Sequence, residues 1–270
     1  MKFTPRALPP EAADASRGHD RHPLRELAML VAAVGAICAA LYLIAVLVAD
    51  AVVTRISPAT EAKLFSSFAT NLPQATALSP ELLNRQATAD RLLTHLLAKA
   101  NLPGLPVNLI VWDKSETNAV ALPGGTIAVT TGLLRCLDEE PGMAFVLAHE
   151  LGHFHGRDHL RGLGRQISFQ VLSALVLSGN GDLQMGAGQM GQLAFLSYSR
   201  KRETAADHYA LRLVHDTFGS EAGATRLFEL LGNESLPGWA YMFATHPGTE
   251  ERIKELQRYA EELARMPKSE

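Results

Sequence analysis

Residues 143–156 read MAFVLAHELGHFHG, an apolar, helix-forming run that contains the pentad His149-Glu150-Leu151-Gly152-His153. On a helix, residues four apart lie on the same face, so the two imidazoles stand side by side as candidate zinc ligands. Glu150 lies next to His149 around the helix, where its carboxylate can take a proton from an attacking water. The spacing therefore predicts a zinc site that carries its own general base.

The residues that flank the pentad support a buried helix. A chain with ten histidines can contain such a pentad by chance, so the flanks matter. Asp138-Glu139-Glu140-Pro141 is typical of a helix N-terminus, and Gly156 is typical of a helix end. Two histidines and a glutamate in an apolar helix cost free energy unless a partner replaces the lost water. A metal ion is such a partner.

A third ligand is predicted downstream. Catalytic zinc sites usually have three protein ligands and one open position. Glu203 and Asp207 are four apart in a helical pattern, so both point the same way. We expect Glu203 to bind the metal and Asp207 to accept a hydrogen bond from a ligand imidazole. The alternative is a solvated charged face beside residues 200–202, but the pentad upstream favours ligation.

Four ordered motifs together resemble a known family. They are the pentad at 149–153, Glu203-x-x-x-Asp207, Thr245-His246-Pro247, and the stretch NAVALPGGTIAV at 118–129 followed by Gly132-Leu133-Leu134. Over about residues 57–265 the chain resembles the membrane-associated gluzincin zinc peptidases, a group that includes the CAAX prenyl protease, HtpX and BepA-like proteins. The resemblance implies a mainly helical α+β fold with a small β-sheet and one zinc ion per chain.

The resemblance also implies a role for each site residue. His149, His153 and Glu203 would bind Zn²⁺, and Glu150 would act as general base. His246 would lie near the metal and stabilise the oxyanion, or occupy the water position in a resting state. A histidine before a proline is by itself more often a loop residue, so the role of His246 rests on the resemblance.

Other polar residues near the motifs have ordinary interpretations. Arg252 either assists at the site or forms an exposed salt bridge. His155 and His159 are four apart, but His155 is expected to face away from the metal side and Gly156 to end the helix between them. Both histidines are interpreted as surface or structural residues.

Two segments are predicted to be strands on the substrate side of the site. Residues 107–112 and 126–130 are rich in β-branched residues, and Pro123-Gly124-Gly125 is a turn signal. In sites of this kind an edge strand beside the metal pairs with the extended substrate backbone. An ordinary sheet under the active-site helix is the alternative. The predicted substrate-binding edge strand consists of Gly125, Thr126, Ile127 and Ala128.

An apolar run near the N-terminus predicts a membrane anchor. Leu27 to Ala49 contains no charged residue and is long enough to cross a bilayer. A cleaved signal peptide is the alternative, with Ala49-Asp50-Ala51 as its cleavage site, but the run exceeds the about 7–15 residues typical of a signal. We therefore predict a disordered tail over 1–26, an uncleaved signal anchor over 27–50 that binds the lipid bilayer, and a zinc metallopeptidase domain over 57–266.

Charge gives a weak indication of sidedness. Arg17, Arg21 and Arg25 precede the anchor, whereas Arg55 and Lys63 follow it. The positive-inside rule then predicts a single-pass protein with the catalytic domain outside the cytoplasm, which is the periplasm in a Gram-negative bacterium. A formal net charge of -3 indicates no nucleic-acid partner, and two cysteines make no disulfide framework.

Three further segments have helical patterns. Ser79-Pro80 is expected to open a helix that runs to about Ala100, and residues 249–266 form a charged amphipathic pattern. Ile167 to Leu177 is apolar but too short to span a bilayer, and a glycine-rich stretch over 179–191 follows it. This arrangement predicts a helical hairpin whose tip caps the cleft or touches the membrane.

The sequence supports two functions of different classes. The first is a membrane-anchored zinc endopeptidase that hydrolyses misfolded or unassembled proteins in quality control. The second is an envelope protein assembly factor or chaperone-like binder with a regulatory zinc site. A binder has no need of the general base Glu150, so the first is favoured.

Overall fold

The computed structural model describes residues 23–66, 74–102, 104–137, 139–176, 199–220, 246 and 250–265. Its mainly helical α+β architecture confirms the predicted fold class. In chain order the elements are α2 (Pro23–Val53), α3 (Pro58–Leu64), α4 (Pro80–Lys99), β1 (Asn108–Trp112), β2 (Ala119–Leu122), β3 (Thr126–Thr130), α5 (Thr131–Cys136), α6 (Glu140–His155), α7 (Asp158–Val176), α9 (Arg200–Phe218) and α12 (Glu250–Ala264).

The predicted anchor is a continuous helix. The chain divides into two units, and the boundary at residues 44 and 45 falls inside α2. By length and composition α2 can cross a membrane, and its large apolar side chains are mostly exposed. It contains the predicted run Leu27–Ala49 with a few residues added at each end. Residues 1–22 of the predicted tail, and the predicted glycine-rich tip at 179–191, lie outside the described residues.

The second unit is built around α6, which carries the pentad. Every residue from Gly142 to Phe154 is buried, as expected for a helix whose residues outside the pentad's polar side chains are apolar on all faces. Pro141 lies in the first turn, and the N–H of the C-cap residue Gly156 donates to the carbonyl of Gly152 at 2.9 Å. These bounds confirm the helix predicted from the flanking residues. The pentad therefore lies in the core and not on a surface helix.

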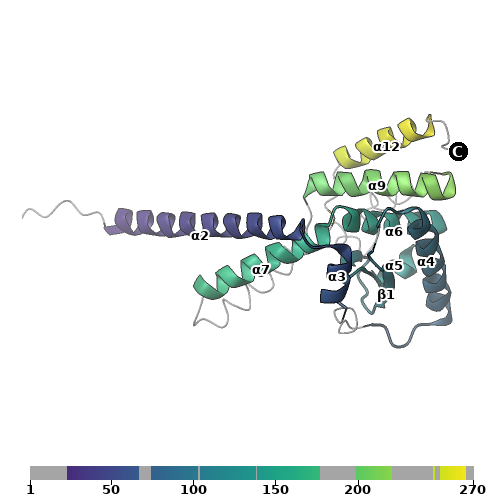
Figure 1. Ribbon diagram of the computed structural model, residues 1–270, viewed down its shortest axis with the longest axis horizontal. Coiled ribbons are helices and arrows are strands. Elements are labelled where there is room, and N and C mark those ends of the chain that lie inside the picture. Colours follow the sequence, from purple (N-terminus) through teal and green to yellow (C-terminus); the bar gives the residue numbers. More distant parts are fainter. Residues whose placement is uncertain are drawn as a thin grey trace, which may run out of the picture. The chain divides into compact units, whose positions relative to one another are not determined.

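Among the described helices, two long ones pack extensively on α6, and a third packs outside them. α4 and α9 both contact α6, and α12 lies along α9 (Figure 1). Ser79 caps α4 by accepting a hydrogen bond from the N–H of Leu82, as the sequence predicts. Leu92 and Leu96 of α4 are buried, and each contributes about 1.5–3 kcal/mol through burial of its side chain. The pentad is thus held by packing from two sides.

Gly152 allows α6 and α9 to approach closely. A Cβ atom at this position would lie 2.9 Å from the Cα and 3.0 Å from the carbonyl oxygen of Ala206. Both atoms belong to the backbone of α9, so they cannot move aside as a flexible side chain would. The absence of a side chain at Gly152 therefore sets the distance between the pentad and Glu203.

The described strands form a sheet in the order β1-β3-β2, with β1 parallel and β2 antiparallel to β3. Pro123-Gly124-Gly125 is the turn that joins β2 to β3, as predicted, and both glycines have the positive φ angles that favour glycine (88° and 85°). Ala119–Leu122, which the sequence analysis did not assign as a strand, occupies an edge and contacts α6.

This topology corrects the prediction of the substrate-binding edge strand. β3 is the central strand, because β2 and β1 take up its hydrogen-bonding groups on both sides. Of the predicted edge residues, Thr126, Ile127 and Ala128 are therefore not available for pairing with a substrate backbone. Gly125 lies in the turn before β3, where its carbonyl oxygen accepts a hydrogen bond from the N–H of Asn108 (2.9 Å). The edge next to α6 belongs to β2, whose four residues are all buried.

A buried ion cluster attaches the segment after α2 to the rest of the domain. Glu61 of α3 is 1% exposed and accepts hydrogen bonds from His159 Nε2 (2.7 Å), Arg157 (3.2 Å) and the N–H of Gly124 (3.2 Å). Burial raises the pKa of Glu61, but His159 and Arg157 outweigh that effect and lower it. His159 is therefore structural, as predicted, while His155 is exposed and stacks on Tyr209.

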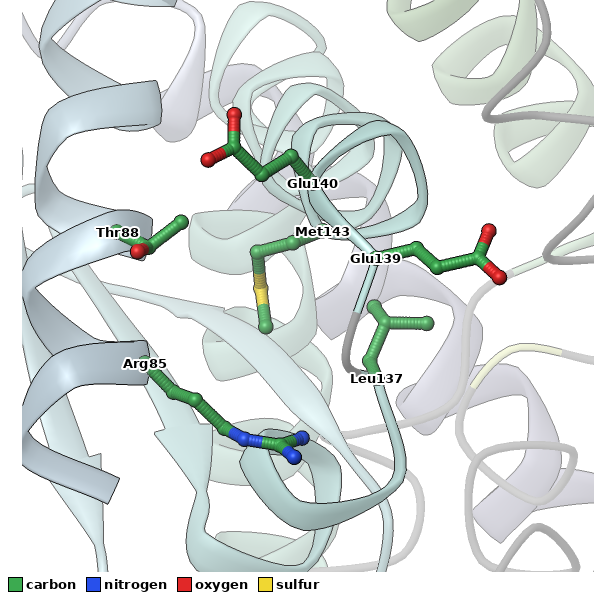
Figure 2. A pocket seen from close by; sticks show the side chains of 6 residues that line it. All are labelled: Arg85, Thr88, Leu137, Glu139, Glu140 and Met143. Carbon is green, nitrogen blue, oxygen red and sulfur yellow. The ribbon is translucent and has the colours of Figure 1, made fainter. Parts of the chain in front are cut away.

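Figure 2 shows a small pocket at the N-terminal end of α6. Arg85 of α4 lines it and donates to the carbonyl oxygens of Leu134 (2.8 Å) and Arg135 (3.1 Å) near the end of α5. These bonds satisfy carbonyl groups that a helix C-terminus leaves unpaired. The pocket lies at the opposite end of α6 from His149 and His153, so it is separate from the candidate site.

Candidate active site

Four buried side chains converge where α6, α9 and residue 246 meet. His149 and His153 come from α6, Glu203 comes from the first turn of α9, and His246 precedes α12. One ligand atom from each lies within 4.8 Å of every other. The two Nε2 atoms of His149 and His153 are 3.1 Å apart, and His246 Nδ1 lies 3.3 Å from His149 Nε2. The structure thus brings together all the residues that the sequence predicted near the metal.

The Glu203 carboxylate completes this group. Its Oε2 lies 3.4 Å from His149 Nε2, and its Oε1 lies 3.4 Å from His153 Nε2 and 3.2 Å from His246 Nδ1. Glu203 is 0% exposed. Three imidazole nitrogens and a carboxylate oxygen make a donor set that suits zinc and other first-row metals.

A carboxylate lies behind each histidine of the pentad. Asp207 Oδ1 is 3.0 Å from His149 Nδ1, on the side of the ring away from the cluster, where the sequence analysis expected it to lie. Asp158 Oδ2 is 3.1 Å from His153 Nδ1. A carboxylate at Nδ1 holds the proton there and directs the Nε2 lone pair inward. Both histidines are therefore oriented towards the same point.

Asp158 is the site residue that the sequence analysis missed. It is the first residue of α7 and comes five positions after His153, and a turn reverses the chain between the two. Arg202 of α9 donates to the other oxygen of Asp158 at 2.9 Å and so fixes the carboxylate. No periodic spacing indicates such a contact, because it depends on the turn at residues 156 and 157.

Arg252 is part of the site and not an exposed salt bridge. It is 9% exposed and donates to Asp207 through Nε and through a second nitrogen at 2.8 Å, while its third nitrogen lies 2.9 Å from Glu203 Oε2. A guanidinium can hold two carboxylates in this way because its donors form a rigid, planar fork. Arg252 therefore fixes the positions of Glu203 and Asp207 from the α12 side.

The carboxylates determine how the histidines titrate. Burial alone would lower the pKa of His149, but Asp207 and Glu203 outweigh it and raise that pKa to about 10. Burial also opposes ionisation of Glu203, yet His246 and the other histidines hold its pKa well below the ordinary value. The site therefore favours a positive charge among its nitrogens, which either a proton or a metal ion can supply.

Glu150 lies beside this group, and no described residue donates a hydrogen bond to its carboxylate. It is 0% exposed, and within the described part of the chain neither of its carboxylate oxygens accepts a hydrogen bond. Its nearest basic contact is His246 Nε2, 3.7 Å from Oε1. Burying a carboxylate that accepts no hydrogen bond costs free energy unless a bound ion, water or ligand interacts with it. This orphaned carboxylate, together with the inward-facing nitrogens, fits a bound metal ion and a water or substrate beside it.

Comparison with known proteins agrees with the geometry. The model of peptidase family M48 matches residues 83–260. The mitochondrial metalloendopeptidase OMA1 of Schizosaccharomyces pombe is 33% identical over 177 residues, which is 64% of this chain and 52% of that protein. The metalloprotease LoiP of Escherichia coli is 28% identical over 162 residues, 58% of this chain and 64% of that protein. The Beta-barrel assembly-enhancing protease of E. coli is 26% identical over 187 residues, 64% of this chain and 38% of that protein.

The matches cover only part of each relative, but they include the candidate site. The chain spans about half the length of the fission yeast relative and less than two thirds of the other two. The matched region contains α6, α9 and His246, and hence the metal-ligand candidates, the orphaned carboxylate and the arginine that supports them. The chain belongs to peptidase family M48.

Proposed function

We propose that this chain is a membrane-anchored endopeptidase that holds one Zn²⁺ ion and hydrolyses peptide bonds of misfolded or unassembled proteins. The observation that carries the proposal is the convergence of the four buried ligand atoms beside the orphaned carboxylate of Glu150. Histidine nitrogens and a glutamate oxygen are typical ligands of catalytic zinc. In this assignment His149, His153 and Glu203 hold the metal.

The chain's own residues supply the proton transfers. When bound, zinc lowers the pKa of a water ligand to about 7 and polarises a carbonyl oxygen. Glu150 takes the proton of the attacking water, because its buried carboxylate is held next to the cluster and has no other hydrogen bond in the described residues. It then passes the proton to the leaving amine. Asp207, Asp158 and Arg252 keep the ligands oriented.

His246 has two possible roles in this mechanism. Its Nδ1 lies among the candidate ligand atoms, which supports a fourth ligand in a resting state. If the ring moves away from the cluster, it can instead donate a hydrogen bond to the oxyanion that develops on the substrate. We propose that the present arrangement is the resting state and that a substrate displaces the ring.

Substrate class is inferred from the relatives and from the site. One relative bears the name Beta-barrel assembly-enhancing protease, and by analogy we propose that this chain acts on proteins whose assembly is incomplete. β2 is the edge strand beside α6 and is buried, so a substrate would pair with it only after displacing what covers it; such main-chain pairing would accept many unfolded sequences. A chaperone-like binder with a regulatory zinc site remains the alternative, but it gives no reason for burying Glu150.

We propose that α2 anchors the domain in a membrane. α2 has the length and composition of a membrane span, and we propose that the domain lies on the non-cytoplasmic side. A reporter enzyme fused after Glu270 that is active only outside the cytoplasm tests the sidedness. Activity of the fused reporter in the cytoplasm would reverse it.

The proposed activity is tested with the full chain in phospholipid vesicles and an unfolded protein as substrate. We expect hydrolysis to stop when a chelator removes the metal and to return when zinc is added. The variant Glu150→Gln should be inactive, and Glu140→Gln is its matched control. Glu140 is an exposed residue of α6 that pairs only with Arg91 among the described residues. Hydrolysis that persists unchanged in the chelator would contradict the proposal.

A further inference from the structure

The outer part of α7 carries an exposed apolar stripe. Ile167, Val171 and Leu175 follow each other at intervals of four residues, and Val176 adjoins the last of them. They are 50%, 55%, 73% and 56% exposed, in a domain whose other apolar side chains are mostly buried. The buried residues of α7 are all in its first turns, from Asp158 to Gly162. α7 thus begins in the core and further along presents an apolar face that the described residues leave uncovered.

The base of α7 lies against the last turns of α2, which belong to the same unit. A Cβ atom on Gly164 would lie 2.9 Å from the Cβ of Ala49, so the two helices touch there. Arg161 and Arg202 each lie 3.8 Å from the carboxylate of Asp50. These contacts fix where the stripe starts, because Ile167 is only three residues, or about 4.5 Å along the helix, beyond Gly164.

Asp50 marks the bilayer boundary if α2 is the anchor. It is the first charged residue after the uncharged run Leu27–Ala49, and a charged side chain in hydrocarbon is costly. The arginines that meet Asp50 therefore lie at the level of the lipid headgroups. Ile167 is about one helical turn from Gly164, which touches Ala49, so the apolar stripe begins close to this boundary, where acyl chains can cover it.

We propose that α7 is a second, interfacial membrane contact whose apolar stripe lies in the headgroup and acyl-chain boundary of the bilayer that holds α2. This inference rests on the proposed membrane anchor. Ser168, Gln170 and Ser173 interrupt the apolar sequence of this continuous helix, as expected of a helix that lies in the interface rather than one that spans the bilayer. A lipid surface fits better than a second copy of the chain, because the stripe is continuous with the anchor contact at Gly164.

The proposed membrane contact of α7 would also hold the active site near the bilayer. Asp158, the first residue of α7, holds His153 in place, and Arg202 joins Asp158 to Asp50. A helix seated in the interface at one end and bonded to a candidate metal ligand at the other fixes the site close to the membrane surface.

The proposal is tested by the lipid exposure of single cysteines in the full chain. Three variants carry an environment-sensitive fluorophore: one at the natural Cys38 of α2 with Cys136→Ser, one at Val171→Cys and one at Leu83→Cys, the last two with both natural cysteines changed to serine. Leu83 is the matched control, because it is 52% exposed on α4, which has no extensive contact with α7. The proteins are placed in vesicles of phosphatidylcholine and phosphatidylglycerol with brominated acyl chains, which quench a fluorophore that touches them.

We expect strong quenching at position 38 and almost none at position 83. At position 171 we expect roughly half the quenching of position 38, because interfacial helices lie about 5–10 Å deep. If the label at position 38 is quenched but the label at position 171 is quenched no more than the label at position 83, the interfacial contact is overturned. The anchor is unaffected by that result. The same conclusion follows if the label at 171 is blue-shifted but unquenched, because protein then covers the stripe. No quenching at position 38 overturns the anchor and this inference with it.

Discussion

At the residue scale, each histidine of the pentad depends on a carboxylate behind it. His149 has Asp207 and His153 has Asp158, and these contacts direct both Nε2 atoms towards Glu203. The sequence predicted Asp207 because it lies four residues after Glu203 on one helix. It did not predict Asp158, because the contact depends on the chain reversal after His155, where Arg157 adopts a left-handed conformation. Helical periodicity reveals partners on one helix and not partners across a turn.

Removal of either carboxylate should weaken metal binding without unfolding the protein. We expect Asp158→Asn and Asp207→Asn each to lower zinc affinity by roughly 10–100-fold, because an amide holds the imidazole less firmly and no longer increases its basicity. A competitive titration against a fluorescent chelator measures the affinity. Asp216→Asn is the control, since Asp216 lies on the exposed face of α9. Equal affinities in all three variants would contradict the supporting roles.

Metal binding should release protons. In the metal-free protein the pKa of His149 is raised to about 10, so at about pH 8 this ring carries a proton that zinc must displace. Glu203 and Asp207 have lowered pKa values and are already ionised. Zinc affinity should therefore rise with pH until about 10, and a pH indicator in weak buffer should record at least one proton released per zinc ion.

The same proton has a predictable effect on the metal-free fold. A histidine whose folded pKa lies above its ordinary value of about 6.5 stabilises the fold fully below that value, and the contribution is lost as pH rises through about 10. Zinc binding without proton release at about pH 8 would contradict the raised pKa of His149.

At the element scale, the site depends on how closely α6 and α9 pack. Gly152 lies between the two histidines on α6, and its missing side chain admits the backbone of α9 at Ala206. We expect Gly152→Val to destabilise the metal-free protein by roughly 1–3 kcal/mol through overpacking and to lower its zinc content, because Glu203 moves away with α9. Urea unfolding and metal analysis measure the two effects.

A matched substitution to valine on the facing helix shows whether the effect of Gly152→Val comes from the close packing of α6 and α9 or from the introduction of valine into a helix. Ala205 is exposed on α9, next to the buried Ala206, so Ala205→Val should alter neither stability nor zinc content appreciably. If Gly152→Val behaved like this control, the close approach of the two helices would not be what positions Glu203.

The helices could be predicted from sequence much better than the sheet. The caps and apolar spacing of α4 and α6 are local signals, and both helices begin and end near the predicted residues. Strand order is not local. Thr126–Thr130 has the composition of a strand, but nothing in it indicates that β1 would pair on one side and β2 on the other. The short run Ala119–Leu122 consists of small and apolar residues that are equally common in helices, so its strand was missed.

At the scale of the whole molecule, the segment after α2 joins the anchor helix to the catalytic domain. Glu61 is buried and bonded to the β2–β3 turn and to the start of α7, so α3 is part of the domain and not a loose linker. Because of this attachment and the contacts of Asp50, the domain begins directly after the last turns of α2. The composition of Leu27–Ala49 predicted the helix, whereas these polar contacts over about a hundred residues of sequence could not be predicted.

The proposed chemistry requires one zinc ion and Glu150 to act together on the peptide bond. Zinc content and hydrolysis of an unfolded protein should therefore be measured on the same preparations of the native chain and of Glu150→Gln. We predict one zinc per chain in both proteins, with hydrolysis at least about 100-fold slower in the variant, because an amide cannot accept the proton of the attacking water. Equal hydrolysis by the two zinc-loaded proteins would show that Glu150 is not the general base.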